Sequence, residues 1–498
     1  MTKKKVLRSS LFAGATAALW FLWIPLTTSG NLRMDSERMI HTPTVALNQY
    51  IQEGRSGLVA LLRLFGLDTW HPVRSGLLFL LFITAAVWML TAALSREAGW
   101  KGSLAPALFA LLYGSSPIWA FHGYFVLQLA PVGLGVLLTT ALACGDVLIM
   151  NREKPAWPTV LLWEAAAAVL LTFCLTIYQS LLVNWLSAVL ILRFARLRWD
   201  ETFHWRDWIR LAIRAVLCTA VSLLIARTLR GPNGAGNMDQ QIRWGTLPFS
   251  WSLLRIAQEV GATLLMVQSR YFSLYTLGAA GTLLFLIRRF RQDPGKKEWN
   301  LHLALCAAAV LLLPFGLSVL LGNVTVPRSQ FALQMASSFL AVFTLQESNR
   351  RRKVVSAVLI ATIVIQVGLC IRLTHTDNLR AAQDRAAAER ISAEMTGMDE
   401  TKPVICTGTL RMNGSAWETE KTDVFGRTFF EWIYEEDQPW TSTDPTLRLL
   451  CAVSGKTLRT ARNTPTLKNA AERAKSMPCY PESGFVCEED DCILIHLK

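Results

Sequence analysis

Long hydrophobic stretches recur along almost the whole of this 498-residue chain, and they constrain its fold more than any other feature. A helix that crosses a bilayer core needs about 20 consecutive, mostly apolar residues. Stretches near that length lie at 11–28, 73–94, 103–121, 124–150, 159–178, 180–197, 208–229, 271–288, 301–321, 327–346 and 354–374. The pattern predicts a polytopic α-helical membrane protein with about eleven transmembrane helices.

Two boundaries in this pattern are weakly marked. Segments 159–178 and 180–197 are almost continuous. A further apolar segment, 249–268, is interrupted by Arg255, Gln258 and Glu259. We therefore expect 249–268 to lie in the membrane interface rather than to cross the bilayer.

Clusters of basic residues fall on one side of the predicted bundle. The net charge of +14 does not indicate nucleic-acid binding, because Lys and Arg gather between the hydrophobic stretches. Clusters lie at 3–8, 96–101, 152–154, 193–206, 288–297 and 350–353. The positive-inside rule assigns them to the cytoplasm, which predicts a cytoplasmic N-terminus and an external C-terminus. No convincing small-x-small cleavage site follows the first stretch, so we expect an uncleaved anchor in the cytoplasmic membrane.

Arginines on the opposite, outer side break this rule. They lie in two predicted loops, 29–72 and 230–270: Arg33, Arg38, Arg55, Arg63, Arg230, Arg243, Arg255 and Arg270. The planar guanidinium group suits phosphate binding, although pairing with neighbouring acids or lipid headgroups is the alternative for any one of them. Charges at a membrane face are costly, so the set as a whole indicates a phosphate site.

The first outer loop combines these arginines with acids and short helices. Asp35 and Glu37 alternate with Arg33 and Arg38, which suits a reaction on a lipid-linked substrate bearing phosphate; internal ion pairs are the alternative. Thr42-Pro43 predicts a helix over 43–52. Residues 55–66 predict an amphipathic helix that either lies in the interface or packs against the bundle.

Short motifs in a fixed order carry a family resemblance over nearly the whole chain. They are Asp35-Ser36-Glu37-Arg38, Glu53-Gly54-Arg55-Ser56-Gly57, His71-Pro72, Ser116-Pro117, Tyr124-Phe125, Tyr178-Gln179-Ser180, Pro327-Arg328 and the run from Met477 to Val486. The chain resembles membrane glucosyltransferases of the bacteriophage O-antigen-modifying type, second family, in the GT-C superfamily. It departs from the family pattern where Ser36 separates the two acids and where Ser56 replaces a proline.

The resemblance implies sugar transfer, with glucose the expected sugar, from a polyprenyl-phosphate-sugar donor to a cell-envelope glycan such as O-antigen at the outer face of the membrane. Asp35 or Glu37 would deprotonate the acceptor hydroxyl. Arg328 and Arg38, followed by Arg55 and Arg270, would stabilise charge on the departing phosphate. Tyr124, Tyr178 and Gln179 would bind substrate; for Tyr178 and Gln179 the alternative is a place in the interfacial belt.

No metal or nucleotide signature accompanies these motifs. The seven His and ten Cys residues are scattered, so we predict no zinc site, although a divalent cation held by loop carboxylates and lipid phosphate stays open. No Gly-rich phosphate loop lies between a strand and a helix, which agrees with a lipid-borne donor.

The chain changes character after the transmembrane part, 1–374. Residues 375–398 predict a charged, Ala-rich stalk helix, and 399–498 predict a small external α/β domain. We expect a strand at 403–406, helices near 446–453 and 464–476, and a hairpin of 484–487 with 492–497. A disulfide among Cys406, Cys451, Cys479, Cys487 and Cys492 is plausible. The domain would either contact the acceptor or stabilise the assembly.

Two other function classes share some of these features. A polysaccharide polymerase or ligase acting on polyprenyl-diphosphate glycans would also need outer arginines, but it typically has a larger outer loop than 230–270. A flippase would place ionisable groups near mid-membrane, and only Glu164 and Gln366 interrupt the apolar stretches. Charge concentrated at one face therefore favours the transferase.

Overall fold

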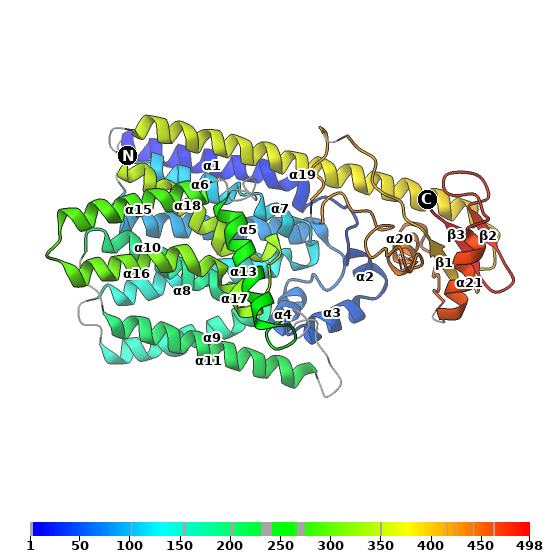
Figure 1. Cartoon of the computed structure of the whole chain (residues 1–498), viewed down its shortest axis with the longest axis horizontal. Helices are drawn as coiled ribbons and strands as arrows, with labels where there is room; N and C mark the ends of the chain where they lie inside the picture. Colours follow the sequence, from blue (N-terminus) through cyan, green and yellow to red (C-terminus); the bar gives the residue numbers. More distant parts are fainter. Residues whose placement is uncertain are drawn as a thin grey trace.

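Long helices lie side by side along the long axis of the molecule, and a smaller C-terminal part extends beyond one end of them (Figure 1). The computed structural model describes the chain apart from residues 1–2, 101, 153–155, 201–203, 231–241, 266–273, 349–350, 416, 423, 442 and 462–463, and the side chains of 3–10, 41, 464 and 465. Of the predicted site residues, Arg270 lies outside the described part.

Each of the predicted hydrophobic stretches overlaps a helix in the structure. These helices are α1 (Lys3–Thr27), α5 (Pro72–Glu97), α6 (Leu104–Gly114), α8 (Leu129–Met150), α9 (Trp157–Ile177), α10 (Leu181–Leu197), α11 (Trp205–Arg230), α15 (Tyr275–Gln292), α16 (Lys297–Leu312), α18 (Phe331–Glu347) and α19 (Arg352–Glu394). Six helical segments among the described residues are long and apolar enough to cross a membrane: those that contain α5, α8, α9, α11, α16 and α19. The protein is thus a multi-pass helical membrane protein, and eleven spans remain a prediction.

Prolines break two of the predicted spans. Stretch 103–121 is not a single helix, because α6 ends at Gly114 and a short helix α7 (Ile118–Gly123) starts after Pro117. Stretch 301–321 is likewise divided by a 3₁₀ turn, η2 (Leu313–Phe315), before α17 (Gly316–Leu321). Proline lacks an amide hydrogen and clashes with the preceding helical turn, and hydrophobicity alone does not report this interruption. A second 3₁₀ turn, η1 (Val126–Gln128), leads into α8.

Short helices gather at the end of the bundle from which the C-terminal part extends, which we call the loop end (Figure 1). They are α2 (Ser36–His41), α3 (Pro43–Gln52), α4 (Ser56–Leu64), α13 (Phe249–Leu264) and the turn η3 (Pro327–Ser329). The predicted helix at 43–52 is confirmed. In α4 the predicted apolar stripe, which includes Leu58 and Leu62, is buried against the bundle, and α4 packs on α9.

The C-terminal part contains the predicted strands and helices. They are β1 (Val404–Thr407), α20 (Thr443–Ser454), α21 (Thr464–Ala474), β2 (Val486–Glu488) and β3 (Ile493–His496). The sheet order is β1-β3-β2, with β1 parallel and β2 antiparallel to β3, so the predicted strand and hairpin are confirmed. Cys451, Cys479, Cys487 and Cys492 are free thiols, so the plausible disulfide is not formed among them.

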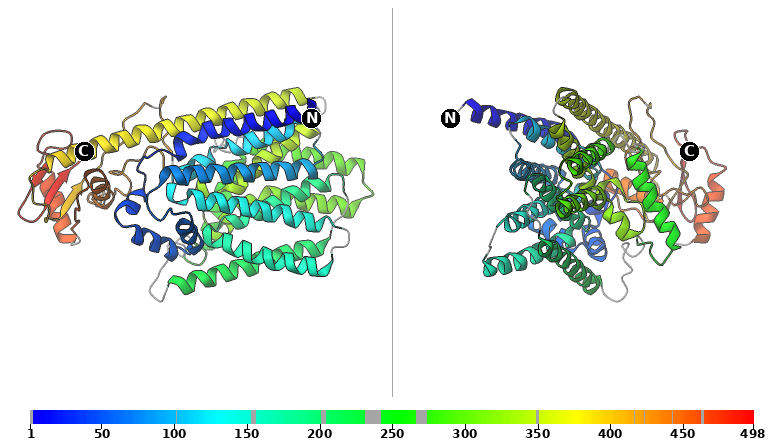
Figure 2. Two further views of the ribbon diagram at one scale, coloured as in Figure 1. Left: turned by 180° about the vertical axis from the view of Figure 1, so that it is seen from behind. Right: turned by 60° about the vertical axis from the view of Figure 1, so that its left-hand side comes forward.

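The helix predicted as a stalk is one half of a continuous helix that stays in contact with the protein. Helix α19 runs for 43 residues along the bundle and on to the C-terminal part (Figure 2). Phe425 from the C-terminal part packs edge-on against Phe121 and Tyr124 of the bundle, with ring centroids 5.4 and 5.5 Å apart. One hydrophobic core therefore continues from the helices into the C-terminal part.

Candidate active site

The first outer loop begins with an aspartate in an unusual backbone conformation. Asp35 has φ 73°, and among the described residues it is the only non-glycine residue with positive φ. It precedes α2, yet its carboxylate makes no capping hydrogen bond to that helix. Aspartate tolerates the left-handed region better than most residues, but the conformation still costs energy, and such outliers cluster at functional sites.

Asp35 lines a polar cavity of about 220 Å³ at the loop end. Arg38, Arg55 and Arg328, three of the predicted phosphate-binding residues, line the same cavity. The remaining lining residues are Ala46, Gln49, Tyr50, Glu53, Phe125, Leu127 and Gln128. The fold thus collects α2, α3, the turn before α4, η1 and η3 around one space, although Asp35 and Arg328 are far apart in sequence.

Side chains around the cavity hold the three arginines in place. Arg38 donates a hydrogen bond to Gln49, and Gln49 donates one to Glu53 at 3.2 Å. Arg55 forms an ion pair with Glu53 at 3.4 Å. The guanidinium group of Arg328 lies 4.4 Å from the ring centroid of Phe125. With both lining carboxylates ionised, three arginines against two acids leave one net positive charge, which suits a phosphate group.

The carboxyl group of Asp35 is suited to accept a proton. Burial raises its pKa above the ordinary value, and Glu53 adds to this, whereas Arg38, Arg448 and Arg328 pull the pKa down. A base with a raised pKa binds a proton more strongly than an ordinary aspartate does. The same arginines keep the anionic form accessible.

Glu37, the other predicted base, is placed differently. It does not line the cavity, and its fully buried carboxylate pairs with Nε of Arg448 from α20 at 2.8 Å. Burial raises the pKa of Glu37 to about 7, despite Arg448, which acts in the opposite direction. The structure therefore separates the two predicted bases: Asp35 faces the cavity, and Glu37 joins the loop to the C-terminal part.

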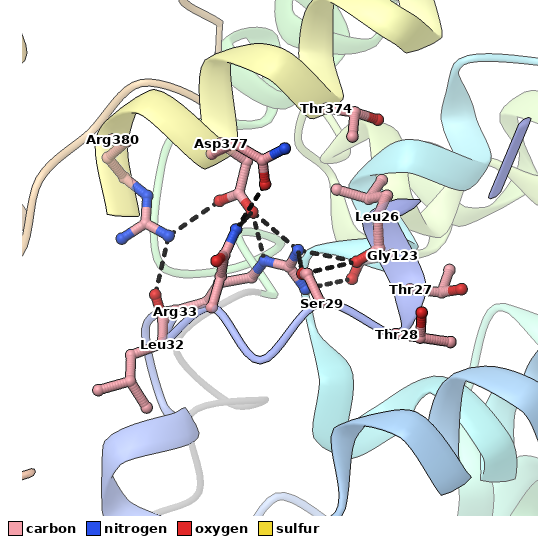
Figure 3. Close-up of polar contacts among 12 residues, drawn as sticks. Leu26, Thr27, Thr28, Ser29, Leu32, Arg33, Gly123, Thr374, Asp377 and Arg380 are labelled. Atoms are coloured by element: carbon pink, nitrogen blue, oxygen red, sulfur yellow. Dashed lines mark hydrogen bonds and ion pairs between the residues drawn. The ribbon is translucent and has the colours of Figure 1, made fainter. Parts of the chain in front are cut away.

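Arg33 forms a second link between the first loop and the C-terminal half of the chain (Figure 3). Its Nη2 lies 2.7 Å from Oδ2 of Asp377 on α19, and both side chains are fully buried. Arg380 binds the other oxygen of Asp377 at 2.9 Å. Burial would raise the pKa of Asp377, but Arg33 and Arg380 outweigh it and hold the pKa well below its usual range. The loop that carries Asp35 is thus fixed just before it by Arg33 and just after it by Glu37.

The predicted substrate-binding residues lie near the cavity but do not line it. Tyr178, which ends α9, lies under the guanidinium group of Arg55 at 5.0 Å. Gln179 approaches Gly54, where a Cβ atom would come within 3.7 Å of its Nε2. Tyr124 is buried and stacks with Trp432, with ring centroids 6.4 Å apart, whereas its neighbour Phe125 faces the cavity. Tyr124 therefore packs against the C-terminal part and does not line the cavity.

An apolar groove adjoins this site on the side of the bundle. It has a volume of about 610 Å³ and lies between α4, α9 and α11, with Ser56, Ala60, Val169, Phe173, Leu217 and Val221 among its lining residues. Arg55 lines the polar cavity and the next residue, Ser56, lines the groove. The start of α4 therefore borders both.

Several residues that line the cavity or pair inside the bundle are not among the predicted site residues. Gln49, Tyr50, Glu53 and Gln128 line the cavity, and helical spacing from Pro43 could have placed Gln49 and Glu53 on one face. Asp377, Arg380 and Asp384 repeat at intervals of three and four, the spacing of one helix face, but such charges usually face water.

Ionisable groups also occur inside the bundle. Arg214 pairs with Asp146 at 2.8 Å and with Glu164 at 2.6 Å, so Glu164 is part of an ion-pair network rather than an isolated polar residue. Asp146 and Arg214 were not predicted as polar intrusions. Among the described residues no group of three or more His, Cys, Asp or Glu side chains could hold a metal ion.

Comparisons with known proteins identify the family. Residues 24–345 match the sequence model of the family described as "Glucosyl transferase GtrII", and this range includes every cavity residue. No curated protein matches the sequence significantly. Among solved structures, ArnT from Cupriavidus metallidurans bound to undecaprenyl phosphate matches with a TM-score of 0.43 and 13% identity, over 81% of this chain and 83% of that chain.

A second solved structure is an oligosaccharyltransferase from Archaeoglobus fulgidus in complex with Zn and sulfate. It matches with a TM-score of 0.41 and 12% identity, over 78% of this chain and 56% of that chain. The family match covers well over half of the present sequence and includes the first outer loop, both loop arginines of the cavity and Arg328. This membrane protein therefore belongs to the GtrII glucosyltransferase family and is a glycosyltransferase.

Proposed function

We propose that this chain, a GT-C transferase, moves a sugar from a polyprenyl-phosphate-sugar donor to a hydroxyl group of a cell-envelope glycan. Glucose is the sugar that the family description favours. The reaction takes place at the outer face of the cytoplasmic membrane, with the N-terminus inside. One observation carries this proposal: a single cavity brings the carboxylate of Asp35 together with three arginines.

These residues divide the chemistry between them. Asp35 accepts the proton of the acceptor hydroxyl while that oxygen bonds to the anomeric carbon of the sugar. The bond from the anomeric carbon to the phosphate oxygen breaks, and polyprenyl phosphate leaves with one more negative charge than it had in the donor. Arg38, Arg55 and Arg328 stabilise this charge, which grows as the bond breaks.

The groove beside α4 supports a donor with a lipid tail. A polyprenyl chain is apolar, and the groove walls supplied by α9 and α11 are mainly apolar side chains. Because the start of α4 borders both spaces, a phosphate in the cavity and a tail in the groove would be joined at Arg55 and Ser56. The tail can pass from the bilayer into the groove at little cost, because both surroundings are apolar.

A transfer assay tests the proposal. Purified protein in detergent would be given radiolabelled polyprenyl-phosphate-glucose and a cell-envelope glycan extract, with polyprenyl-phosphate-mannose and polyprenyl-diphosphate glycans as comparison donors. We expect label to move from the monophosphate donor to the glycan. Elongation or transfer of the diphosphate-linked glycan without monophosphate turnover would instead indicate a polymerase or ligase. Lipid translocation in vesicles without sugar transfer would indicate a flippase.

A further inference from the structure

Helix α13 is an amphipathic helix whose faces are arranged in an unexpected way. Its exposed side is mainly apolar and includes Phe249, Leu253 and Leu254, although Arg255 and Gln258 are exposed as well. The residues it buries are polar: Ser252, Glu259 and Thr263. Glu259, with only 2% of its surface exposed, is the charged member of this set. Burying a carboxylate costs free energy unless the group is well hydrogen-bonded. The hydrogen-bond partners of Glu259 therefore indicate its role.

Four hydrogen bonds reach Glu259, and all come from residues 318–330, which run from within α17 to the start of α18. Thr325 donates twice, from its hydroxyl group at 2.6 Å and from its backbone amide at 3.2 Å. The hydroxyl group of Ser318 and the side-chain amide of Gln330 donate the others. Each carboxylate oxygen thus accepts two bonds, and the donors are spread over both ends of a thirteen-residue segment, 318–330.

The residues before α13 hold the same segment. The backbone amide of Arg243 donates to the carbonyl oxygen of Leu321 at 2.8 Å, and the indole of Trp244 donates to that of Val319 at 2.7 Å. Gly322 lies so close to Trp244 that a Cβ atom there would be 2.8 Å from the indole ring. Residues 243–244, which precede α13, therefore hold the start of segment 318–330 by two hydrogen bonds.

Arg328 is the member of this segment that reaches the cavity. It lies on η3, between Thr325 and Gln330, both of which bind Glu259. The turn η3 packs against α7, and the guanidinium group of Arg328 crosses the ring of Phe125 into the cavity. Glu259 does not line the cavity, so any influence on substrate passes through this turn.

We infer that Glu259 is a positioning residue for donor binding: its carboxylate fixes the turn that presents Arg328 to the lipid phosphate. This inference rests on the proposed function, because it assigns Arg328 to the donor phosphate. The loop that contains α13 then has a defined role at the membrane surface. The apolar side chains of α13 contact lipid, while Glu259 sets the position of a phosphate-binding arginine.

A double-mutant cycle on the full chain tests this inference. The variants are Glu259→Gln, Arg328→Gln and the double variant, and the probe is synthetic polyprenyl monophosphate, with binding to the detergent-purified protein measured by tryptophan fluorescence. Arg328→Gln should weaken binding about 10-fold to 100-fold, the effect of losing a hydrogen bond to a charged group. Glu259→Gln should weaken binding to a similar degree, and should have no further effect when Arg328 is already replaced.

Matched controls separate positioning from a general loss of structure. Ser252 is buried on the same face of α13, and its hydroxyl group has no hydrogen-bond partner among the described residues, so Ser252→Ala should bind the probe as the wild type does. Thr325→Val removes one donor to Glu259 without touching α13, and it should weaken binding in the same direction. If Glu259→Gln does not fold, the double-mutant cycle is repeated with Thr325→Val in its place, alone and combined with Arg328→Gln.

The outcomes distinguish the inference from the proposed function. If Arg328→Gln weakens binding while Glu259→Gln and Thr325→Val do not, the positioning role is wrong and the donor site stands. Independent effects that multiply in the double variant also contradict the positioning role. If Arg328→Gln binds polyprenyl phosphate as tightly as the wild type, the donor site itself is wrong, and the role of Glu259 falls with it.

Discussion

Arg448 donates a hydrogen bond from its Nε to Oε1 of Glu37 at 2.8 Å, and this contact joins α20 to α2 across 411 positions of the sequence. Two residues before Glu37, the side chain of Asp35 lines the polar cavity. The acidic pair of the first loop is therefore divided between two tasks. One carboxylate holds the C-terminal part against the loop, and the other faces the space where we place the reaction.

The buried position of Glu37 predicts a pH-dependent contribution to stability. Its pKa is about 7 in the folded protein, above the ordinary value of 4.5. A raised carboxyl pKa gives stability that is present below the unfolded pKa and is lost as the pH rises through the folded pKa. The melting temperature of the wild type, relative to that of Glu37→Gln, should therefore fall between about pH 4.5 and about pH 7. Parallel melting curves across this range would contradict the burial of an ionisable Glu37.

The charges around Asp35 predict opposite shifts in the pH dependence of sugar transfer. Arg38 lowers the pKa of Asp35, and Glu53 raises it. If Asp35 is the base, Arg38→Gln should move the acidic limb of the kcat profile to higher pH, and Glu53→Gln should move it to lower pH. The position of the limb is the readout, because both variants also alter donor binding. Identical limbs in the two variants would argue that another group accepts the proton.

The buried pair of Arg33 and Asp377 predicts a large loss of stability when it is broken. Asp377→Asn leaves the fully buried Arg33 without its charged partner, which should cost about 3–5 kcal/mol. Glu389→Gln on the same helix breaks an exposed pair with Arg385 and should change stability by less than about 1 kcal/mol. Thermal unfolding in detergent compares the two. Equal melting temperatures would show that the Arg33–Asp377 contact does not anchor the first loop.

The groove between α4, α9 and α11 predicts a dependence on the length of the donor tail. Val221→Trp should fill part of the groove and raise KM for a long-chain donor about tenfold, because overfilling a packed site costs about 1–3 kcal/mol. A donor with a short prenyl chain should be unaffected. Leu224→Trp, at an exposed position of the same helix outside the groove, is the control. A rise in KM that is equal for both donors would place the tail elsewhere.

The hydrophobic pattern was sufficient to predict the helical architecture and much of the loop end. It located the long helices, the helix at 43–52 and the boundary at Tyr178, because each depends on local composition and on turn-forming or capping residues. Unusual charges at a membrane face pointed to Asp35, Arg38 and Arg55 without any knowledge of the fold. The family resemblance added Arg328, and the structure brings these four residues to one cavity.

Contacts between segments far apart in the chain could not be predicted from the sequence. The pairing of Glu37 with Arg448, and of Arg33 with Asp377, depends on how the C-terminal part folds back on the first loop, and no local pattern reports it. Asp377 and Arg380 resemble the exposed charges of a stalk helix, yet both are fully buried. The sequence showed Glu259 only as an interruption in an apolar segment. In the structure its four hydrogen bonds fix residues 318–330.

Comparison of Asp35→Asn with Glu37→Gln in a transfer assay tests the central claim most directly. Both variants would be checked for folding and for binding of polyprenyl phosphate. We predict that Asp35→Asn lowers kcat at least about 100-fold with binding retained, as expected for the loss of a general base, and that Glu37→Gln stays within about tenfold of the wild type. Full activity in Asp35→Asn, or a folded but inactive Glu37→Gln, would contradict the assignment of Asp35 as the base.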